Sequence, residues 1–518
     1  MTKTNGFESL KLRSELLENL PSLGYKEMTT IQAESLPVIL KGQDVLARAK
    51  TGSGKTAAFA LGALNKINPT LSKVQSLILC PTRELANQVT EETRRLAKRI
   101  PNVRVLCLCG GNPMGPQLGS LKRGAHIVVG TPGRLLKHLE KETLLLGNMS
   151  ILILDEADRM LDMGFSEEIE TILEYVPRKR QTLLFSATYP DVIADISEEI
   201  QKEPVEIDVR DREDPAEIEE YWSEVEHEDR LQHLHQAIEH WGGTLNIVFC
   251  NTKLECTEIA KYLVEENIVA LAIHGDLEQS ERTVALIQFS NESATVLVAT
   301  DVAARGLDIG KVDVVFNYEL PKQPEVYVHR IGRTGRAGRA GRAVSLVTSR
   351  ELRRLKEIER QFPDHAIEEF AVERMSGRVN ALIAPMATIE ISGGRRNKLS
   401  PGDFLGALTS TQVIPGNAVG KIDVLESKTF IALKTQHQSQ AVRLLNQEMI
   451  KGNAYRARSL SQGAKGENWN RGNHRKRSNP NDRSQSSNRS HAILRGQSGN
   501  RIQGKNPWKT WEIGKQEQ

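Results

Sequence analysis

Short runs of Val, Ile and Leu recur along the first 350 residues, and the stretches between them carry apolar residues at helical spacing. Runs this short are typical of strands buried in parallel sheets, with the helices as crossover connections. They fall into two groups, which predicts two doubly wound α/β domains. The first group comprises Leu77–Cys80, Val103–Cys109, His126–Val129, Ile151–Leu154 and Thr182–Phe185, and the second comprises Ile247–Cys250, Val269–Ile273, Val296–Val298, Val312–Phe316 and Ala343–Val347.

The pattern changes after Pro385. It predicts the order βαββαβ, a small α+β sheet with helices on one face. Beyond Ser461 the chain is rich in Asn, Ser, Gly, Gln and Arg and poor in aliphatic residues, which predicts a disordered tail. The expected elements are Thr388–Ile391, Pro401–Leu408, Lys421–Leu425, Phe430–Leu433, Gln438–Met449 and Ala454–Ser459.

The length of 518 residues fits three or four units. An acidic stretch from Arg210 to Glu220, containing Pro215, is expected to link the first two. We predict α/β domains at 1–209 and 210–380, a small domain at 385–460 and a tail at 461–518. Five cysteines without a CxxC pair, and no apolar stretch of signal or membrane length, predict a cytoplasmic protein.

The net charge of +3 is unevenly distributed. From Ser461 to Gln518 there are 12 Lys and Arg against 4 Asp and Glu, a net of +8, which leaves −5 (3 minus 8) for the first 460 residues. A folded body with this charge does not attract polyanions overall, so any nucleic-acid contact there must use local patches.

Polar clusters follow the predicted strands. CPTREL, GTPGR, DEAD and SAT follow runs of the first group, and NTK and TD follow runs of the second. Ligands of open parallel sheets gather beyond the carboxyl ends of the strands, so these loops predict a shared cleft.

The segment 49–56, AKTGSGKT, follows the apolar Val45–Ala47 and precedes a helical stretch. This is the context of a P-loop, although Ala49 stands where the general pattern has Gly. Lys55 is expected to neutralise the β and γ phosphates of ATP, and Thr56 to reach Mg²⁺. The alternative is a glycine-rich structural turn. The predicted phosphate-binding residues are Thr51, Gly52, Ser53, Gly54, Lys55 and Thr56.

The tetrad Asp155-Glu-Ala-Asp158 ends the most apolar run of the first group. A carboxylate at this position can hold the water shell of Mg²⁺, and its neighbour can activate the attacking water. We therefore assign Asp155 to the metal and Glu156 to the general base. A solvated helix start is the alternative for an acidic tetrad.

The segment 329–336, HRIGRTGR, places three arginines and His329 within eight residues. Guanidinium groups suit the charge that spreads over a γ-phosphate during transfer. Arg333 and Arg336 are predicted to act with Lys55 and Glu156 in catalysis, as fingers supplied by the second domain upon closure. Alternatively such a cluster is a plain nucleic-acid patch, as the following Arg339 and Arg342 could be.

Together these motifs resemble the DEAD-box RNA helicase family over residues 5–350. The ordered set is GYKEMTTIQ, AKTGSGKT, PTRELANQ, GG, TPGR, DEAD, SAT, NTK, QSER, ATDVAARGLD and HRIGRTGR. The resemblance implies two tandem RecA-like domains, ATP and Mg²⁺ as cofactors, and ATP hydrolysis coupled to local unwinding of RNA.

The resemblance also implies roles for single residues. Gln32 would read the adenine edge, Phe7 would stack on its ring, and Asp308 would face the ribose. Ser186 and Thr188 would connect the DEAD loop to the RNA-bound state. The implied RNA contacts are Arg83, Gly111, Thr131, Gly133, Arg134, Thr252, Arg282, Thr300 and Asp301.

Residues 386–460 resemble the RNA-binding domain of the bacterial DbpA group, most closely in ISGGRRNKLSPGDFLGALT and AVGKIDV. An RRM-like fold is implied, with a hairpin of large-subunit ribosomal RNA and the pre-ribosomal particle as partners. RRMs stack bases on sheet aromatics, but only Phe430 is available on the central strands. A protein-interaction domain of the same fold is the alternative. The expected RNA contacts are Arg395, Arg396, Lys398, Lys421 and Lys434.

The tail interleaves the basic segment Arg471–Arg477 with Trp469, Trp508 and Trp511. This mixture fits loose RNA binding, or a solubilising tail without a partner. The sequence thus predicts a monomeric RNA helicase of large-subunit maturation. An ATP-gated RNA clamp and a passive RNA-binding or annealing protein are the alternatives.

Overall fold

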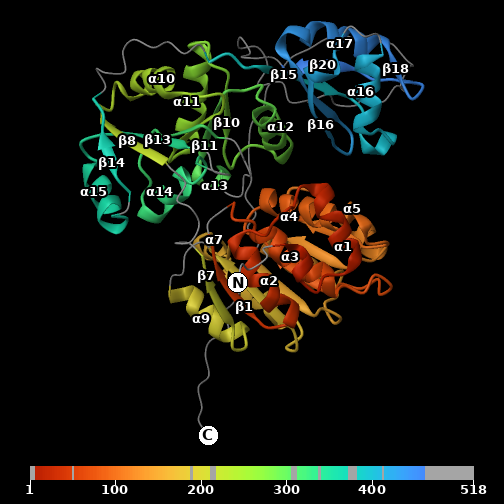
Figure 1. Ribbon diagram of the computed structural model, residues 1–518. Coiled ribbons are helices and arrows are strands. Elements are labelled where there is room, and N and C mark those ends of the chain that lie inside the picture. The colour runs from red at the N-terminus through yellow and green to blue at the C-terminus, as the bar shows by residue number, and fades with distance from the viewer. Residues whose placement is uncertain are drawn as a thin grey trace, which may run out of the picture. The chain divides into compact units, whose positions relative to one another are not determined.

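A computed structural model describes residues 6–49, 52–186, 191–209, 218–304, 312–335, 340–363, 365–371, 382–410 and 414–460 (Figure 1). The first of its sheets is parallel throughout, with the order β3-β4-β2-β5-β6-β1-β7. Its strands are β1 (Val45–Arg48), β2 (Ser76–Leu79), β3 (Val105–Leu108), β4 (Ile127–Gly130), β5 (Ile151–Asp155), β6 (Gln181–Ser186) and β7 (Val205–Asp208).

Helices cover both faces of this sheet, which explains the continuous apolar runs. Along β5, Ile151 and Ile153 belong to one apolar cluster, and Leu152 and Leu154 belong to the other. The first face is covered by α1 (Ser14–Asn19), α2 (Thr30–Lys41), α3 (Lys55–Lys66) and α4 (Arg83–Leu96), and the second by α5 (Met114–Lys122), α6 (Pro132–Glu140), α7 (Ala157–Asp162), α8 (Ser166–Glu174) and α9 (Asp191–Ile200).

The second sheet is also parallel and has the order β10-β11-β9-β12-β13-β8-β14. Its strands are β8 (Ile218–Glu224), β9 (Asn246–Cys250), β10 (Ala270–Ile273), β11 (Val296–Thr300), β12 (Val314–Asn317), β13 (Gly341–Val347) and β14 (Ile367–Glu369). Its helices are α10 (Arg230–Trp241), α11 (Lys253–Glu265), α12 (Gln279–Ser290), α13 (Asp301–Ala304), α14 (Pro324–Ile331) and α15 (Leu352–Gln361).

All ten apolar runs are strands, so the prediction of two doubly wound domains is confirmed. The prediction for the linker was partly wrong, because Ile218–Glu220 begins β8; residues 210–217 lie outside the described residues. The strands β7, β8 and β14 were missed. They lie at or next to a sheet edge, where half-exposed strands need no apolar run.

The third sheet is antiparallel, with the order β16-β17-β15-β20. It forms the predicted RRM-like fold, and both helices pack on one face through a single apolar cluster. A hairpin of β18 and β19 precedes the last strand, so the expected helix ends earlier and the last strand begins later than predicted. The elements are β15 (Met386–Ile391), α16 (Pro401–Thr409), β16 (Val419–Val424), β17 (Thr429–Lys434), α17 (Gln438–Gln447), β18 (Met449–Ile450), β19 (Asn453–Ala454) and β20 (Ala457–Leu460).

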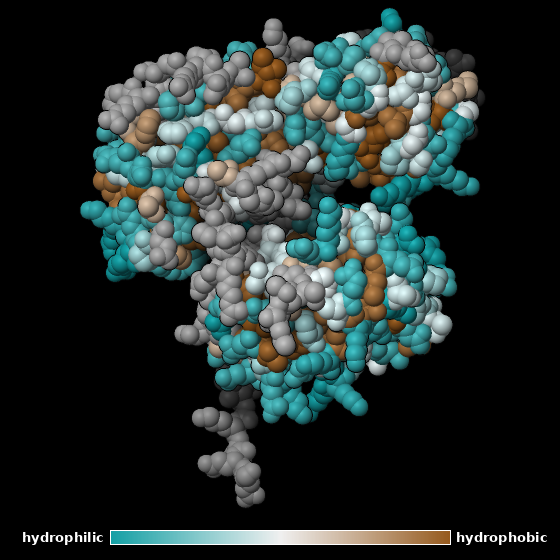
Figure 2. All heavy atoms as spheres, in the orientation of Figure 1, coloured by the Kyte–Doolittle hydropathy of each residue, from teal (hydrophilic) through white to brown (hydrophobic). Residues whose placement is uncertain are grey.

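The visible surface is largely hydrophilic, with smaller hydrophobic areas between polar side chains (Figure 2). Among the described helices, none is long and apolar enough to cross a membrane. The predicted tail, 461–518, lies outside the described residues.

A network of polar contacts holds the start of α16. Ser400 caps the helix, and its amide and hydroxyl both donate to Asp403 Oδ2 at 2.7 Å. Lys451 Nζ lies 2.8 Å from the same oxygen and also donates to the carbonyl of Lys398. The Lys451 ammonium and the Ser400 hydrogen bonds lower the pKa of Asp403 to about 2.

We expect Asp403→Asn to destabilise the C-terminal domain in a pH-dependent way. The pKa of Asp403 is lowered from 3.8 in the unfolded chain to about 2 in the folded domain. Its contribution to the free energy of unfolding is therefore complete above about pH 4 and is lost as the pH falls towards about 2. Urea unfolding of the full chain should show a gap between wild type and variant at neutral pH that narrows below about pH 4. A gap that is constant with pH would contradict this account.

Candidate nucleotide and RNA site

The P-loop lies where β1 passes into α3. Gly54 precedes the helix with a φ of +94°, and a Cβ atom there would lie 2.5 Å from Gln32 Nε2. Lys55 is buried in the first helical turn and donates from Nζ to the carbonyl of Ala49 at 2.8 Å. Thr56 follows on the same turn. The glycine thus allows the loop and Gln32 to approach closely.

Gln32 joins this loop to the start of α2. Its Nε2 donates to the carbonyl of Gly54 at 3.1 Å, and its Oε1 accepts from the amide of Thr29 at 3.1 Å. The second bond is half of a capping box, so Thr29 fixes the helix start. Phe7 is buried in the apolar cluster that also contains Ile31 of α2. Its ring lies edge-on to that of Tyr25, with 6.2 Å between the ring centroids.

The acidic tetrad begins at the end of β5. Asp155 is buried, and burial, together with the neighbouring Glu156, raises its pKa to about 7, against the opposing charge of Lys55. Glu156 adopts the left-handed conformation (φ 50°, ψ 53°) between β5 and α7. For a residue with a side chain this costs about 1–3 kcal/mol, and such strain clusters at functional sites.

The residues present fit a nucleotide with a cation. Within the part of the chain that the structure describes, Ser53 Oγ and Glu156 Oε2 are buried without a hydrogen-bond partner. A buried polar atom left in this state costs about 1–3 kcal/mol. A phosphate and the water shell of a divalent ion would satisfy both atoms, and the ion would favour the charged form of Asp155.

A second set of loops lies at the same edge of the first sheet. Arg83 begins α4, which is capped by Thr82, and its guanidinium lies against the glycine turn after β3. Gly111 has a φ of +77°, and a Cβ atom there would lie 2.3 Å from Arg83 Nη1. The structure therefore brings two of the predicted RNA contacts together.

Gln117 connects this turn to the TPGR segment. Its Nε2 donates to the carbonyl of Cys109 at 3.0 Å, and its Oε1 accepts from Arg134 Nη1 at 2.9 Å. Arg134 Nη1 also donates to the carbonyl of Asn112, at 2.9 Å. The buried His138, one turn after Arg134, also bonds to Gln117 Oε1 at 2.9 Å. Thr131 caps α6, and Gly133 lies in its first turn.

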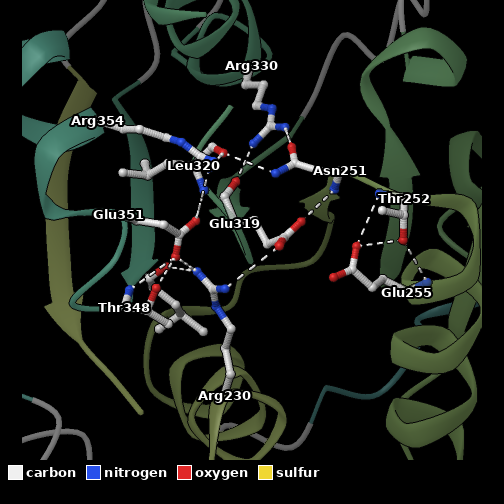
Figure 3. A network of polar contacts seen from close by, with 11 residues as sticks. Arg230, Asn251, Thr252, Glu255, Glu319, Leu320, Arg330, Thr348, Glu351 and Arg354 are labelled. Atoms are coloured by element: carbon white, nitrogen blue, oxygen red, sulfur yellow. Dashed lines mark hydrogen bonds and ion pairs between the residues drawn. The ribbon is translucent and has the colours of Figure 1, made fainter. Parts of the chain in front are cut away.

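In the second sheet, Arg330 connects three loops, and Figure 3 shows its contacts with Asn251 and Glu319. It is buried, and its Nε and Nη2 donate to the two carboxylate oxygens of Asp301 at 2.6 and 2.8 Å. Nη2 also donates to Asn251 Oδ1 at 2.9 Å, and Nη1 donates to the carbonyl of Glu319 at 2.6 Å. The loops after β9, β11 and β12 are thereby fixed to one guanidinium.

Arg230 is a second buried arginine in this network. It donates to the carbonyl of Leu346 at 2.7 Å, pairs with Glu351, and lies 5.1 Å from the ring centroid of Tyr318. Glu319 lies between the two arginines, with its Oε1 3.9 Å from Arg230 Nη1 (Figure 3). The second sheet thus carries its buried positive charge at the carboxyl ends of its strands.

The other predicted residues of the second sheet are distributed as follows. Thr252 caps α11, and its hydroxyl donates to Glu255 Oε2 at 2.7 Å in a capping box. Thr300 ends β11, Arg282 lies in the first half of α12, and Arg333 is buried just after α14. The predicted residues outside the described ranges are Thr51, Thr188, Asp308 and Arg336.

In the C-terminal domain, the basic loop lies on the turn between β16 and β17. The amides of Arg395 and Arg396 donate to the carbonyls of Leu425 and Glu426 at 2.8 and 3.0 Å. The side chains of Arg395, Arg396 and Lys398 are exposed. Phe430 is fully buried, so it offers no ring for base stacking.

Comparison with known proteins agrees with this geometry. The DEAD/DEAH box helicase family matches residues 29–196, the helicase conserved C-terminal domain matches 229–338, and the DbpA RNA binding domain matches 388–459. The ATP-dependent RNA helicase DbpA of Escherichia coli is 46% identical over 86% of this chain and 97% of its own length. The chain belongs to the DEAD-box RNA helicases of the DbpA group.

Other relatives cover the helicase part. The DEAD-box ATP-dependent RNA helicase CshA of Bacillus cereus is 46% identical over 68% of this chain and 67% of its own length. A solved structure of an S. cerevisiae Dbp5 variant bound to RNA and ADP BeF3 is 30% identical, with a TM-score of 0.66 over 72% of this chain and 97% of that chain. This DEAD-box helicase is therefore an ATP-hydrolysing enzyme that binds RNA.

Sequence reasoning missed three residues of this DEAD-box helicase. Arg330 lies inside HRIGRTGR, but its role as a buried anchor could not be separated from that of its neighbours. Gln117 and Arg230 lie outside every motif. The one signal that could have pointed to Gln117 is the spacing of Arg134 and His138, which lie one helical turn apart on the same face of α6.

We expect Gln117→Ala to weaken RNA binding by about tenfold, because the glycine turn and Arg134 would lose a shared buried partner. Fluorescence anisotropy with single-stranded RNA and AMP-PNP would measure this. Gln43→Ala, which removes an exposed glutamine of the same domain, is the control. Equal RNA affinities for the two variants would contradict the positioning role.

We expect Arg330→Ala to reduce the free energy of unfolding by about 1.5–3 kcal/mol, the contribution of a hydrogen bond to a charged group, because the partly buried carboxylate of Asp301 would lose its partner. Denaturant unfolding of the full chain would measure this, with Arg350→Ala as the control for an exposed arginine of the same domain. A loss no larger than that of the control would show that Arg330 is not an anchor.

Proposed function

We propose that this helicase remodels large-subunit ribosomal RNA during ribosome assembly. In this proposal the C-terminal domain binds a structured RNA element, and the two RecA-like domains hydrolyse ATP and separate strands nearby. A specific anchor raises the effective concentration of RNA at the helicase domains. The identity of 46% to a DbpA helicase, over 97% of that helicase's length, supports the proposal.

The observation that carries the RNA assignment is the basic loop Arg395–Lys398. Its backbone is tied to the neighbouring turn while its three cationic side chains are exposed. Because Phe430 is buried, recognition would use this loop and not stacking on the sheet. Arg396 has a carboxylate 3.6 Å away, Glu426 Oε2, which an RNA phosphate would displace.

We propose the residue roles expected from the motifs for catalysis. Asp155 and Thr56 would hold Mg²⁺ with its water shell, Lys55 would neutralise the phosphates, and Glu156 would accept the proton of the attacking water. Arg333 and Arg336 would stabilise charge on the γ-phosphate. The remaining proposed nucleotide contacts are Phe7, Gln32, Thr51, Gly52, Ser53, Gly54 and Asp308, and the RNA contacts are Arg83, Gly111, Thr131, Gly133, Arg134, Thr252, Arg282, Thr300 and Asp301.

The organisation proposed for the chain follows the same account. RecA-like domains would span 1–209 and 210–380, the RNA-binding domain 385–460, and a basic tail 461–518. We propose a monomer that works in the cytoplasm on pre-ribosomal particles. The three family matches, which do not overlap, support this division.

Steady-state ATP hydrolysis with three RNAs tests the proposal. They are a large-subunit ribosomal fragment, an unrelated structured RNA and poly(A), each with wild type and with Arg395→Gln/Arg396→Gln/Lys398→Gln. Selective stimulation by the ribosomal fragment should be lost in this variant and kept in Arg178→Gln/Lys179→Gln/Lys202→Gln, which removes three exposed cations elsewhere. Equal stimulation by all three RNAs would leave a general RNA helicase or clamp.

We expect Glu156→Gln to lower ATP turnover by at least about a hundredfold, the effect of losing a general base. ATP should still bind, so the variant should remain on RNA as a long-lived complex. Single-turnover hydrolysis and RNA dissociation rates would measure both effects, with Glu140→Gln as the exposed control. Normal turnover would remove Glu156 from the general-base role.

A further inference from the structure

One edge of the first domain carries a dense positive charge that the helicase motifs do not use. Residues 94–123 contain seven Lys and Arg and no Asp or Glu, a net charge of +7, whereas the first 460 residues together carry −5. The cations are Arg94, Arg95, Lys98, Arg99, Arg104, Lys122 and Arg123.

A cavity of about 400 Å³ lies within this segment, between the ends of α4 and α5 and the start of β3. Four of the cations line it. Its apolar wall is formed by Ile100, Val103 and Leu106. The volume falls in the range of small-ligand pockets, and the lining combines cations with an apolar surface. The lining cations are Arg94, Lys98, Arg104 and Arg123.

Part of this charge has a structural explanation. Arg94, Arg95 and Lys122 lie in the last turns of their helices, where cations offset the exposed carbonyl groups. Arg94 also pairs with Glu91 at 2.7 Å, and its Nη2 donates to the carbonyl of Val105 at 2.8 Å. These cations are engaged without a ligand.

The remaining cations of the cavity lack a carboxylate partner. Lys98, Arg104 and Arg123 are exposed and form no ion pair with any carboxylate of the described residues. Arg123 Nη2 donates to Ser120 Oγ at 3.2 Å, and Arg104 bonds to the carbonyl of Arg123. Three cations around an apolar wall therefore face solvent, in a body whose net charge is negative.

One strand, β3, connects the cavity to the glycine turn. β3 is the edge strand of its sheet, and its carboxyl end passes into the glycine turn at Gly111. Arg104 and Gly111 are seven positions apart, which corresponds to about 23 Å of extended chain at about 3.3 Å per residue. RNA leaving the turn could follow β3 to the cavity within a few nucleotides.

We propose that the cavity is an auxiliary site for single-stranded RNA that continues past the glycine turn. Phosphates would contact Lys98, Arg104 and Arg123, and a base would lie against Ile100 and Val103. Guanidinium groups suit phosphate, and apolar surfaces suit the faces of bases. The inference rests on the proposed function, which places RNA at Gly111. An acidic protein segment would pair with the cations but would leave the apolar wall of the cavity without a partner.

The test measures the Kd of the full chain for oligo(U) strands of increasing length in the presence of AMP-PNP. Lys98→Gln/Arg123→Gln removes two cations of the cavity, and Arg178→Gln/Lys179→Gln removes two exposed cations at another edge. Wild type and control should gain affinity once strands pass the glycine turn, and the cavity variant should not. For the longest strands its Kd should be at least about fivefold higher and its salt slope lower by about 1.4.

Each other outcome overturns the inference. If the cavity and control variants coincide at every length, the cations only offset helix ends. If the cavity variant binds short and long strands with equally reduced affinity, the cations attract RNA by their overall charge and form no local site. Binding of poly(Glu) that depends on Lys98 and Arg123, with no effect of RNA length, would assign the site to an acidic protein.

Two further variants keep the test interpretable. If the double variant melts at a lower temperature than wild type, Lys98→Gln alone takes its place. The Lys98 side chain forms no hydrogen bond with the described residues, so its loss should not affect folding. Arg134→Gln tests the proposed RNA contacts beside the glycine turn. If the affinity for short strands is unchanged in this variant, the proposed role of Arg134 is wrong. The gain in affinity with strand length still tests the cavity.

Discussion

The direction of parallel strands is the constraint on which both large sheets depend. Each crossover leaves the carboxyl end of a strand and returns to the amino end of a parallel neighbour. The loops that start helices therefore gather at one edge. The P-loop after β1, the Arg83 segment after β2, the glycine turn after β3 and Glu156 after β5 lie at that edge of the first sheet. Residues far apart in sequence thus come into contact, as Gln32 does with Gly54.

Buried charge distinguishes the two edges. In the first sheet it is negative, since Asp155 and Glu156 are both buried and one oxygen of Glu156 has no partner among the described residues. Burial raises the pKa of Asp155 to about 7, against the opposing charge of Lys55. In the second sheet the buried charge is paired, since the guanidinium groups of Arg330 and Arg230 contact carboxylates and carbonyl groups. The first arrangement suits a cation with phosphates, and the second fixes the loops that would contact RNA.

The sequence predicted what periodicity and motif context determine. Ile151–Leu154 read as a strand because both faces of its sheet are covered, and the tetrad after it was placed correctly. The strand Ile218–Glu224 was missed because it lies one position from a sheet edge and has the sequence IEEYWSE, which contains three glutamates and no apolar run. The hairpin Met449–Ala454 was missed because strands of two residues leave no pattern.

Partners that depend on tertiary contacts could not be predicted. Gln117 acquires its place only when α5 and α6 pack beside β3, and Arg230 only when α10 meets the end of β13. A lone Gln or Arg on a helix is ordinarily a surface residue. The burial of Phe430 likewise follows from the folded chain and not from its place on a central strand.

The central claim is that ATP and RNA bind at coupled sites built from these loop edges. The most direct measurement is the Kd for RNA with and without AMP-PNP, paired with the Kd for AMP-PNP with and without RNA. The account predicts that each ligand tightens the other by the same factor, of about 5–150-fold, because linkage is reciprocal. Unchanged affinities in both directions would mean that the two sites act independently and would contradict the account.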